Sequence, residues 1–230
     1  MLKIQALNQF YGESHTLWDV GLDVPVGQCT CLMGRNGVGK TTLLKSIMGG
    51  LRVASGTVEF EGKDLSKSPP EERARRGIGF VPQGREIFSQ LTVEENLRIG
   101  LSARRDGKKK LPEKIMELFP ILKTMLKRRG GDLSGGQQQQ LAIGRALALD
   151  PKLLILDEPT EGIQPNIVQQ IGDVLLKLQA EGLTVLLVEQ KLKFARRVAS
   201  QFSILDRGRS VASGKIEELD DALIQRYLVV

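Results

Sequence analysis

The sequence has few aromatic residues and no long apolar segment. Phe, Trp and Tyr make up only 4% of its 230 residues, which leaves little material for the stacking surfaces that bind single-stranded nucleic acid. The longest apolar runs, 153–156 and 185–188, are far shorter than the ~20 residues of a membrane-spanning helix. The N-terminus lacks the charged and then apolar layout of a signal peptide. We therefore expect a protein that stays in the cytoplasm and reaches a membrane only through partners.

Cysteine is also scarce, since the chain contains only Cys29 and Cys31. The apolar run around them predicts a buried strand on which both side chains share one face. Two cysteines so close on a strand cannot form a disulfide without distorting it, and a reducing compartment fits. A metal or redox role would need further ligands, and the neighbouring sequence offers none. We interpret both cysteines as core residues.

The net charge of +6 raises the question of an acidic partner such as nucleic acid. The excess is scattered, and its densest cluster is residues 104–110. The internal Asp106-Gly107 and the Leu111-Pro112 that follows predict a solvated loop between helices. Contact with anionic lipid headgroups is the alternative for this loop.

The order of predicted elements indicates an α/β fold with a parallel sheet. Strand, helix and strand in succession imply right-handed crossovers between parallel strands. Residues 84 to about 150 look mainly helical, and Thr92 with Glu95 forms a capping box there. The predicted strands are 2–7, 21–24, 28–33, 56–60, 77–81, 153–156 and 184–188, and the predicted helices outside the insert are 40–48 and 165–180.

The segment 34–41 has the pattern GxxxxGK[ST] of a phosphate-binding loop, the Walker A motif. Glycines let the backbone curl so that successive N–H groups point at phosphate oxygens, and the N-terminus of the following helix adds partial positive charge. Lys40 is expected to bridge the β- and γ-phosphates, and the Thr41 hydroxyl to bind Mg²⁺. The candidate nucleotide-binding residues here are Gly34, Arg35, Asn36, Gly37, Val38, Gly39, Lys40, Thr41 and Thr42.

Residues 153–158 read as an apolar strand that ends in two acids, the Walker B pattern. The carboxyl end of a central parallel strand faces the ligand crevice, so both acids are expected to point at bound nucleotide. Asp157 would hold Mg²⁺, directly or through water. Glu158 would orient or deprotonate the attacking water.

The segment 133–137 reads Leu-Ser-Gly-Gly-Gln and opens another helix. Ser134 is expected to cap that helix, so that the backbone amides of Gly135, Gly136 and Gln137 form a second anion-binding terminus. With this segment beside the two Walker motifs, the whole chain resembles the ATP-binding cassette (ABC) family of ATPases.

The resemblance implies a P-loop core with an antiparallel β subdomain and a helical insert. Within one cassette of residues 1–230, the core and β subdomain would be 1–83 and 151–230, and the helical insert 84–150. It implies that Ser134, Gly135, Gly136 and Gln137 contact ATP held by a second cassette. Tyr11 matches the aromatic that stacks on adenine, and Gln83 the glutamine that senses Mg²⁺ and the attacking water.

Two positions depart from the family pattern. Gln190 stands where the family usually has a γ-phosphate-binding histidine, and Gln164 where it usually has aspartate. The only histidine, His15, is expected in an N-terminal surface loop. Gln190 can donate a hydrogen bond but cannot carry charge. We keep Gln190 as a candidate catalytic residue, with Glu158, Lys40 and Gln83.

The sequence resembles the ATPases of branched-chain amino acid importers in segments 158–165 and 188–190. It looks closest to their urea-type branch in segments 34–39, 133–141 and 224–228. The resemblance implies an ATPase subunit that binds ATP and Mg²⁺ and energises uptake of a small polar solute. We expect urea first and branched-chain or other amino acids second. A weakly hydrolysing regulatory cassette is the alternative of another class.

The implied partners are a second cassette, the same or homologous, and two membrane subunits, with a periplasmic binding protein acting indirectly. The chain would then lie on the inner face of the cell membrane. Residues 84–101 are expected to form the socket for a membrane subunit. Nucleic acid is not an expected partner.

Overall fold

Two β-sheets organise the chain in the computed structural model, which describes residues 1–229. The larger sheet has the strand order β10-β9-β3-β8-β7-β6, and all neighbours are parallel except β10, which pairs antiparallel with β9. Its strands are β3 (Cys29–Met33), β6 (Ile78–Val81), β7 (Leu153–Asp157), β8 (Thr184–Val188), β9 (Gln201–Asp206) and β10 (Arg209–Lys215). The smaller sheet is antiparallel, in the order β2-β1-β4-β5. Its strands are β1 (Leu2–Tyr11), β2 (Ser14–Val24), β4 (Ser55–Phe60) and β5 (Lys63–Asp64).

The central strands are apolar because both faces of the larger sheet are covered. Every residue of β3, β7 and β8 is buried. Side chains alternate between the faces, so Leu154 and Leu156 pack toward α6 and α7 while Leu153 and Ile155 pack toward α1 and the smaller sheet. The parallel strands therefore separate two apolar cores.

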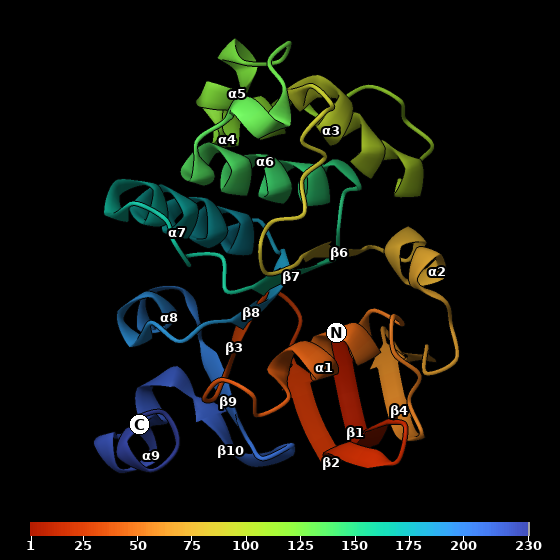
Figure 1. Cartoon of the computed structure of the whole chain (residues 1–230), viewed down its shortest axis with the longest axis vertical. Coiled ribbons are helices and arrows are strands. Elements are labelled where there is room, and N and C mark those ends of the chain that lie inside the picture. The colour runs from red at the N-terminus through yellow and green to blue at the C-terminus, as the bar shows by residue number, and fades with distance from the viewer. Residues whose placement is uncertain (230) are drawn as a thin grey trace.

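Helices cover both faces of the larger sheet (Figure 1). The helix α1 (Lys40–Ile47) follows β3 and lies between the two sheets, where it contributes Leu43, Leu44 and Ile47 to the core. On the other face lie α6 (Gly135–Ala148), α7 (Pro165–Ala180) and α8 (Leu192–Val198). The remaining helices outside the segment between β6 and β7 are α2 (Pro70–Arg75), η3 (Ile216–Glu218) and α9 (Asp221–Tyr227).

The segment between β6 and β7 contains helices and no named strand (Figure 1). Before α6 these are α3 (Val93–Gly100), η1 (Leu101–Ala103), α4 (Glu113–Leu118), α5 (Pro120–Thr124) and η2 (Gly130–Asp132). The capping box predicted for Thr92 and Glu95 is present. The longest helix that the structure describes, α7, has 16 residues. Within residues 1–229, no helix combines the length and the apolar character needed to cross a membrane.

The predicted α/β fold is confirmed, but the N-terminal strands were predicted too short. β1 and β2 form a long hairpin whose register shifts between Ile4 and Leu7, between Leu7 and Gln9, and between Gln9 and Phe10. Such irregularities destroy the strict alternation by which a strand is recognised in sequence. The prediction of a surface loop around His15 was therefore wrong. His15 is partly buried in β2, with its ring stacked between those of Phe10 and Trp18 at centroid distances of 4.0 and 3.5 Å.

Candidate nucleotide site

A cavity of about 670 Å³ opens at the carboxyl ends of β3, β7 and β8. This is the edge at which parallel α/β sheets bind ligands, because the loops after the strands leave a crevice there. Residues of five separate segments meet in it. The lining consists of Thr16, Asn36, Gly37, Gly39, Lys40, Thr41, Thr42, Gln83, Glu158, Thr160, Glu161, Gly162, Glu189, Gln190 and Lys191.

The loop between β3 and α1 needs glycine at two positions. Gly34 has φ +147°, and a Cβ atom there would lie 2.3 Å from the backbone oxygen of Leu205. Gly39, with φ +108°, precedes the first helical residue, and a Cβ there would lie 2.8 Å from Leu17. The loop can therefore turn tightly against β9 and β2 while its backbone faces the cavity.

Lys40 holds the loop closed from inside. Its side chain is only 6% exposed, and its ammonium Nζ donates to the carbonyl oxygens of Gly34 at 2.8 Å and Arg35 at 2.9 Å. The same Nζ lies 3.9 Å from Oε1 of Glu158. Burial lowers the pKa of Lys40, and the carboxylates of Glu158 and Asp157 oppose that shift. A cation is thus placed at the centre of the loop, where phosphate oxygens would gather.

Asp157 ends β7 and is almost fully buried. Its Oδ2 has no hydrogen-bond partner among the described residues, which is costly for a buried carboxylate oxygen. Burial raises the pKa of Asp157 to about 6, and the negative charge of the neighbouring Glu158 adds to the shift. An unpaired, buried oxygen of this kind fits the hard oxygen ligands that Mg²⁺ prefers.

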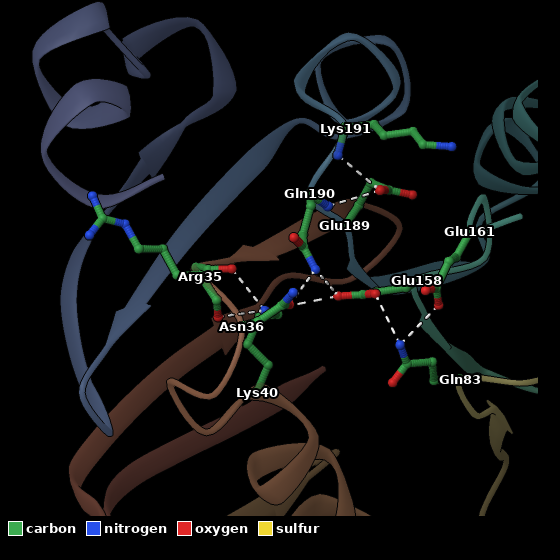
Figure 2. Close-up of polar contacts among 10 residues, drawn as sticks. Arg35, Asn36, Lys40, Gln83, Glu158, Glu161, Glu189, Gln190 and Lys191 are labelled. Carbon is green, nitrogen blue, oxygen red and sulfur yellow. Dashed lines mark hydrogen bonds and ion pairs between the residues drawn. The ribbon is translucent and has the colours of Figure 1, made fainter. Parts of the chain in front are cut away.

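The carboxylate of Glu158 is held by two amides from opposite sides (Figure 2). Gln83, which follows β6, donates to Oε2 of Glu158 at 3.2 Å and to Oε2 of Glu161 at 2.9 Å. Gln190, which follows β8, donates to Oε1 of Glu158. The backbone of Glu158 is in the left-handed region, with φ +47°. This conformation is uncommon for a residue with a side chain and often marks functional sites.

Gln190 also reaches the phosphate loop. Its Nε2 donates to Oδ1 of Asn36 at 2.8 Å. The residue before it, Glu189, is 3% exposed and accepts hydrogen bonds from the backbone N–H groups of Gln190 at 2.8 Å and Lys191 at 2.9 Å. Glu189 accepts a further bond from the Thr160 hydroxyl at 2.7 Å. The loops that follow β7 and β8 are therefore tied together behind Gln190.

Several lining residues were missed by the sequence analysis: Thr16, Thr160, Glu161, Gly162, Glu189 and Lys191. Four of them, Thr160, Glu161, Glu189 and Lys191, had a signal, because each lies within three residues of a predicted site residue. Thr16 had none, since only the hairpin of β1 and β2 brings it to the loop after β3.

Some predicted residues lie outside this lining. The side chain of Val38 is in the core between the two sheets, and that of Arg35 points away from the other labelled residues (Figure 2). Tyr11 is 49% exposed at the end of β1. The residues Ser134, Gly135, Gly136 and Gln137 line a separate cavity of about 460 Å³, where Ser134 forms a capping box with Gln137.

The phosphate loop, the paired acids and the parallel sheet together define a P-loop nucleotide-binding protein. The sequence profile described as ABC transporter matches residues 17–161. The high-affinity branched-chain amino acid transport ATP-binding protein BraG of Pseudomonas aeruginosa is 44% identical over 92% of this chain and 91% of its own length. A probable branched-chain amino acid transport ATP-binding protein of Archaeoglobus fulgidus is 40% identical over 95% of this chain and 94% of its own length.

Solved structures agree with the sequence relatives. An ATP-binding cassette in its ADP conformation superposes with a TM-score of 0.85 at 32% identity, covering 98% of this chain and 97% of that one. A dimeric cassette bound to ADP and phosphate superposes with a TM-score of 0.83 at 26% identity. The match covers 94% of this chain and 99% of that one. The chain belongs to the ABC transporter family and is an ATPase of that family. The resemblance predicted from the sequence is confirmed.

Proposed function

We propose that this chain energises the import of branched-chain amino acids or chemically related amino acids. The observation that carries the proposal is the 44% identity to BraG across nearly the full length of both chains. Urea was the first expectation from the sequence, with branched-chain amino acids second. The two relatives described above are named for branched-chain amino acids and neither for urea, so they favour the second expectation.

In this proposal the loop of residues 34–42 cradles the phosphates of ATP. Lys40 would exchange its two carbonyl partners for β- and γ-phosphate oxygens, which is favoured because the incoming oxygens are charged. Mg²⁺ would be held by the Thr41 hydroxyl and the free oxygen of Asp157, with Gln83 nearby. When bound, the ion supplies charge neutralisation of the phosphates.

Glu158 would act on the attacking water. Its position at the cavity, 3.9 Å from Lys40, places a carboxylate beside the phosphate loop. Gln83 and Gln190 would orient it from either side, and each has an amide N–H that could turn to the water or to the γ-phosphate. A weakly hydrolysing regulatory cassette is disfavoured, because the carboxylate that this role would lack is present and oriented.

The cavity beside Ser134 would receive nucleotide from a second cassette. The long helix α6 begins at Gly135, so its first backbone N–H groups and its positive end face that cavity. Gly135, Gly136 and Gln137 would contact the γ-phosphate together with Ser134, and Tyr11 of the opposite chain would stack on its own adenine. Two cassettes paired in this way would close around two nucleotides.

The membrane partners would dock on the helical segment between β6 and β7. Phe88 and Ile99 are 48% and 37% exposed there, within the stretch 84–101 assigned to a membrane subunit. Exposed apolar side chains of this size suit a protein contact. The complete importer would contain two cassettes, two membrane subunits and a periplasmic binding protein, with this chain on the inner face of the cell membrane. The division into a core of 1–83 and 151–230 and an insert of 84–150 belongs to the same proposal.

Uptake measurements in cells that lack this chain test the solute. We expect uptake of radiolabelled leucine to fall and uptake of labelled urea to stay unchanged. Restoration by the wild-type chain, but not by Glu158→Gln, would tie uptake to hydrolysis. Impaired urea uptake with normal leucine uptake would overturn the proposal and return the assignment to urea.

A further inference from the structure

The side chain of Arg35 joins the phosphate loop to the C-terminal helix α9. Its Nη2 donates to the carbonyl oxygen of Arg226 at 3.5 Å and to that of Val229. These carbonyls belong to the last turn of α9 and the residues just after it. The C-terminal end of a helix carries partial negative charge, so a guanidinium is favoured there.

The backbone of the same residue contacts the central lysine of the site. The carbonyl oxygen of Arg35 accepts from Nζ of Lys40 at 2.9 Å. Next along the chain, the side chain of Asn36 accepts from Gln190. Arg35 is therefore fixed from outside the cavity by α9 and from inside by Lys40, and a movement of α9 would shift the peptide group on which Lys40 rests.

Few residues of α9 pack against the rest of the chain. The helix has seven residues, of which only Ile224 is buried, at 8% exposed, while Leu223 and Tyr227 are partly buried. A helix this short is unstable in water without tertiary contacts. Its position therefore depends on a few contacts, which include the hydrogen bonds from Arg35.

We propose that Arg35 is a positioning residue that couples the docking of α9 to nucleotide binding. With α9 docked, the loop is held in the shape that receives phosphate. When α9 is released, the loop must be ordered at the expense of binding free energy. Coupling is reciprocal, so bound nucleotide also favours docked α9, and any partner that pulls α9 away lowers the affinity for nucleotide. The inference rests on the phosphate site proposed above.

Titration of the full chain with ADP and Mg²⁺ by calorimetry tests it. Arg35→Ala is expected to raise the Kd for ADP by about fivefold or more, the lower end of typical coupling. Arg35→Lys should recover part of the loss, since an ammonium can still reach a carbonyl oxygen. Gln225→Ala changes an exposed residue of α9 and should leave the Kd unchanged. An unchanged Kd for Arg35→Ala would overturn the inference.

A double-mutant cycle separates coupling through α9 from a direct effect on the loop. Ile224→Ala loosens α9 without touching the loop, and it should raise the Kd on its own. In the double variant with Arg35→Ala, the Kd should rise little beyond that of Arg35→Ala alone, because both changes weaken the same contact between α9 and the phosphate loop. Effects that add fully would contradict the inference. Failure of the wild-type chain to bind ADP would instead refute the phosphate site itself.

Discussion

Gln190 and Asn36 are joined across the nucleotide cavity by a hydrogen bond of 2.8 Å, from the amide Nε2 of the first to the amide Oδ1 of the second. The same Nε2 donates to Glu158. A residue after β8 thus connects the phosphate loop to the acid that ends the Walker B segment. Because an amide does not titrate, this connection persists at any pH at which the protein is folded.

Replacing Gln190 with histidine should therefore introduce a pH dependence. The imidazole would lie beside the Glu158 carboxylate, which raises its pKa above the ordinary value of about 6.5. As the pH falls through about 7, the imidazolium gains a charge-assisted bond to phosphate. The ratio of variant to wild-type kcat should then rise by about fivefold, equivalent to roughly 1 kcal/mol.

Steady-state phosphate release between pH 6 and pH 9 measures this ratio. Gln190→Asn is the matched control, because it keeps the amide but shortens its reach. That variant should be slower than wild type by the same factor at every pH. A histidine variant whose ratio to wild type stays constant over the range would contradict the role given to Gln190.

Asp157→Asn should stabilise the nucleotide-free protein at neutral pH. The pKa of Asp157 in the folded chain is about 6, above the ordinary value of 3.8, because the carboxylate is buried. Ionisation at pH 7 therefore opposes folding by about 2 to 3 kcal/mol. This penalty is absent below about pH 3, where the carboxyl is protonated in both states, and it grows between about pH 4 and pH 6. The free energy of unfolding of the variant should exceed that of wild type at pH 7 and match it near about pH 3.

Urea denaturation at the two pH values measures the difference. In the presence of ADP, added Mg²⁺ should stabilise wild type but not the variant, since asparagine does not replace the carboxylate charge. A variant that is less stable than wild type at pH 7, or that responds to Mg²⁺ as wild type does, would contradict the assignment of Asp157.

Arg73 is expected to be a stability determinant although it lies outside the nucleotide cavity. It is 1% exposed, and its guanidinium donates to the carbonyl oxygens of Ser46 and Ile47 at the end of α1, at 2.8 and 2.6 Å, and to Ser68 at 2.9 Å. Arg73→Met would leave the carbonyl oxygens of Ile47 and Ser68 without a partner, while Ser46 keeps its bond from the Gly49 N–H. We expect a cost of about 2 to 3 kcal/mol. For a chain of this size that lowers Tm by about 5 to 10 °C.

Thermal unfolding followed by circular dichroism tests this expectation. Arg75→Met changes the same side chain two residues further along α2, where it is exposed, and should leave Tm nearly unchanged. Equal Tm values for the two variants would show that the buried arginine does not stabilise the end of α1.

The residues whose roles follow from local geometry could be predicted from the sequence. The turn of the phosphate loop, the acids at the end of β7 and the cap at Ser134 each depend on neighbours within a few positions, so their patterns are visible in one dimension. Arg73 and Thr16 gave no such signal. Arg73 bonds to Ile47, and Thr16 lines the cavity with the phosphate loop. Both partners are 20 or more positions away, and only the packing of the sheets brings them together.

The N-terminal hairpin shows the same limit in the fold. Its register shifts remove the alternation on which strand prediction depends, so β2 was predicted as a loop and a short strand. The residues joined by the bonds from Arg35 to the end of α9 are more than 190 positions apart in the sequence. The sequence therefore placed Arg35 in the phosphate loop but gave no indication that its side chain contacts α9.

We expect Glu158 to drive ATP hydrolysis from within the described cavity. Phosphate release by the full chain with Mg²⁺-ATP, compared between wild type and Glu158→Gln, tests it most directly. Glu161→Gln, which alters another carboxylate bound by Gln83, is the comparison and should lower kcat by about tenfold at most. We predict that Glu158→Gln lowers kcat by about a hundredfold or more while ATP binding is retained. A Glu158→Gln variant that hydrolyses ATP as fast as wild type would show that Glu158 does not drive hydrolysis.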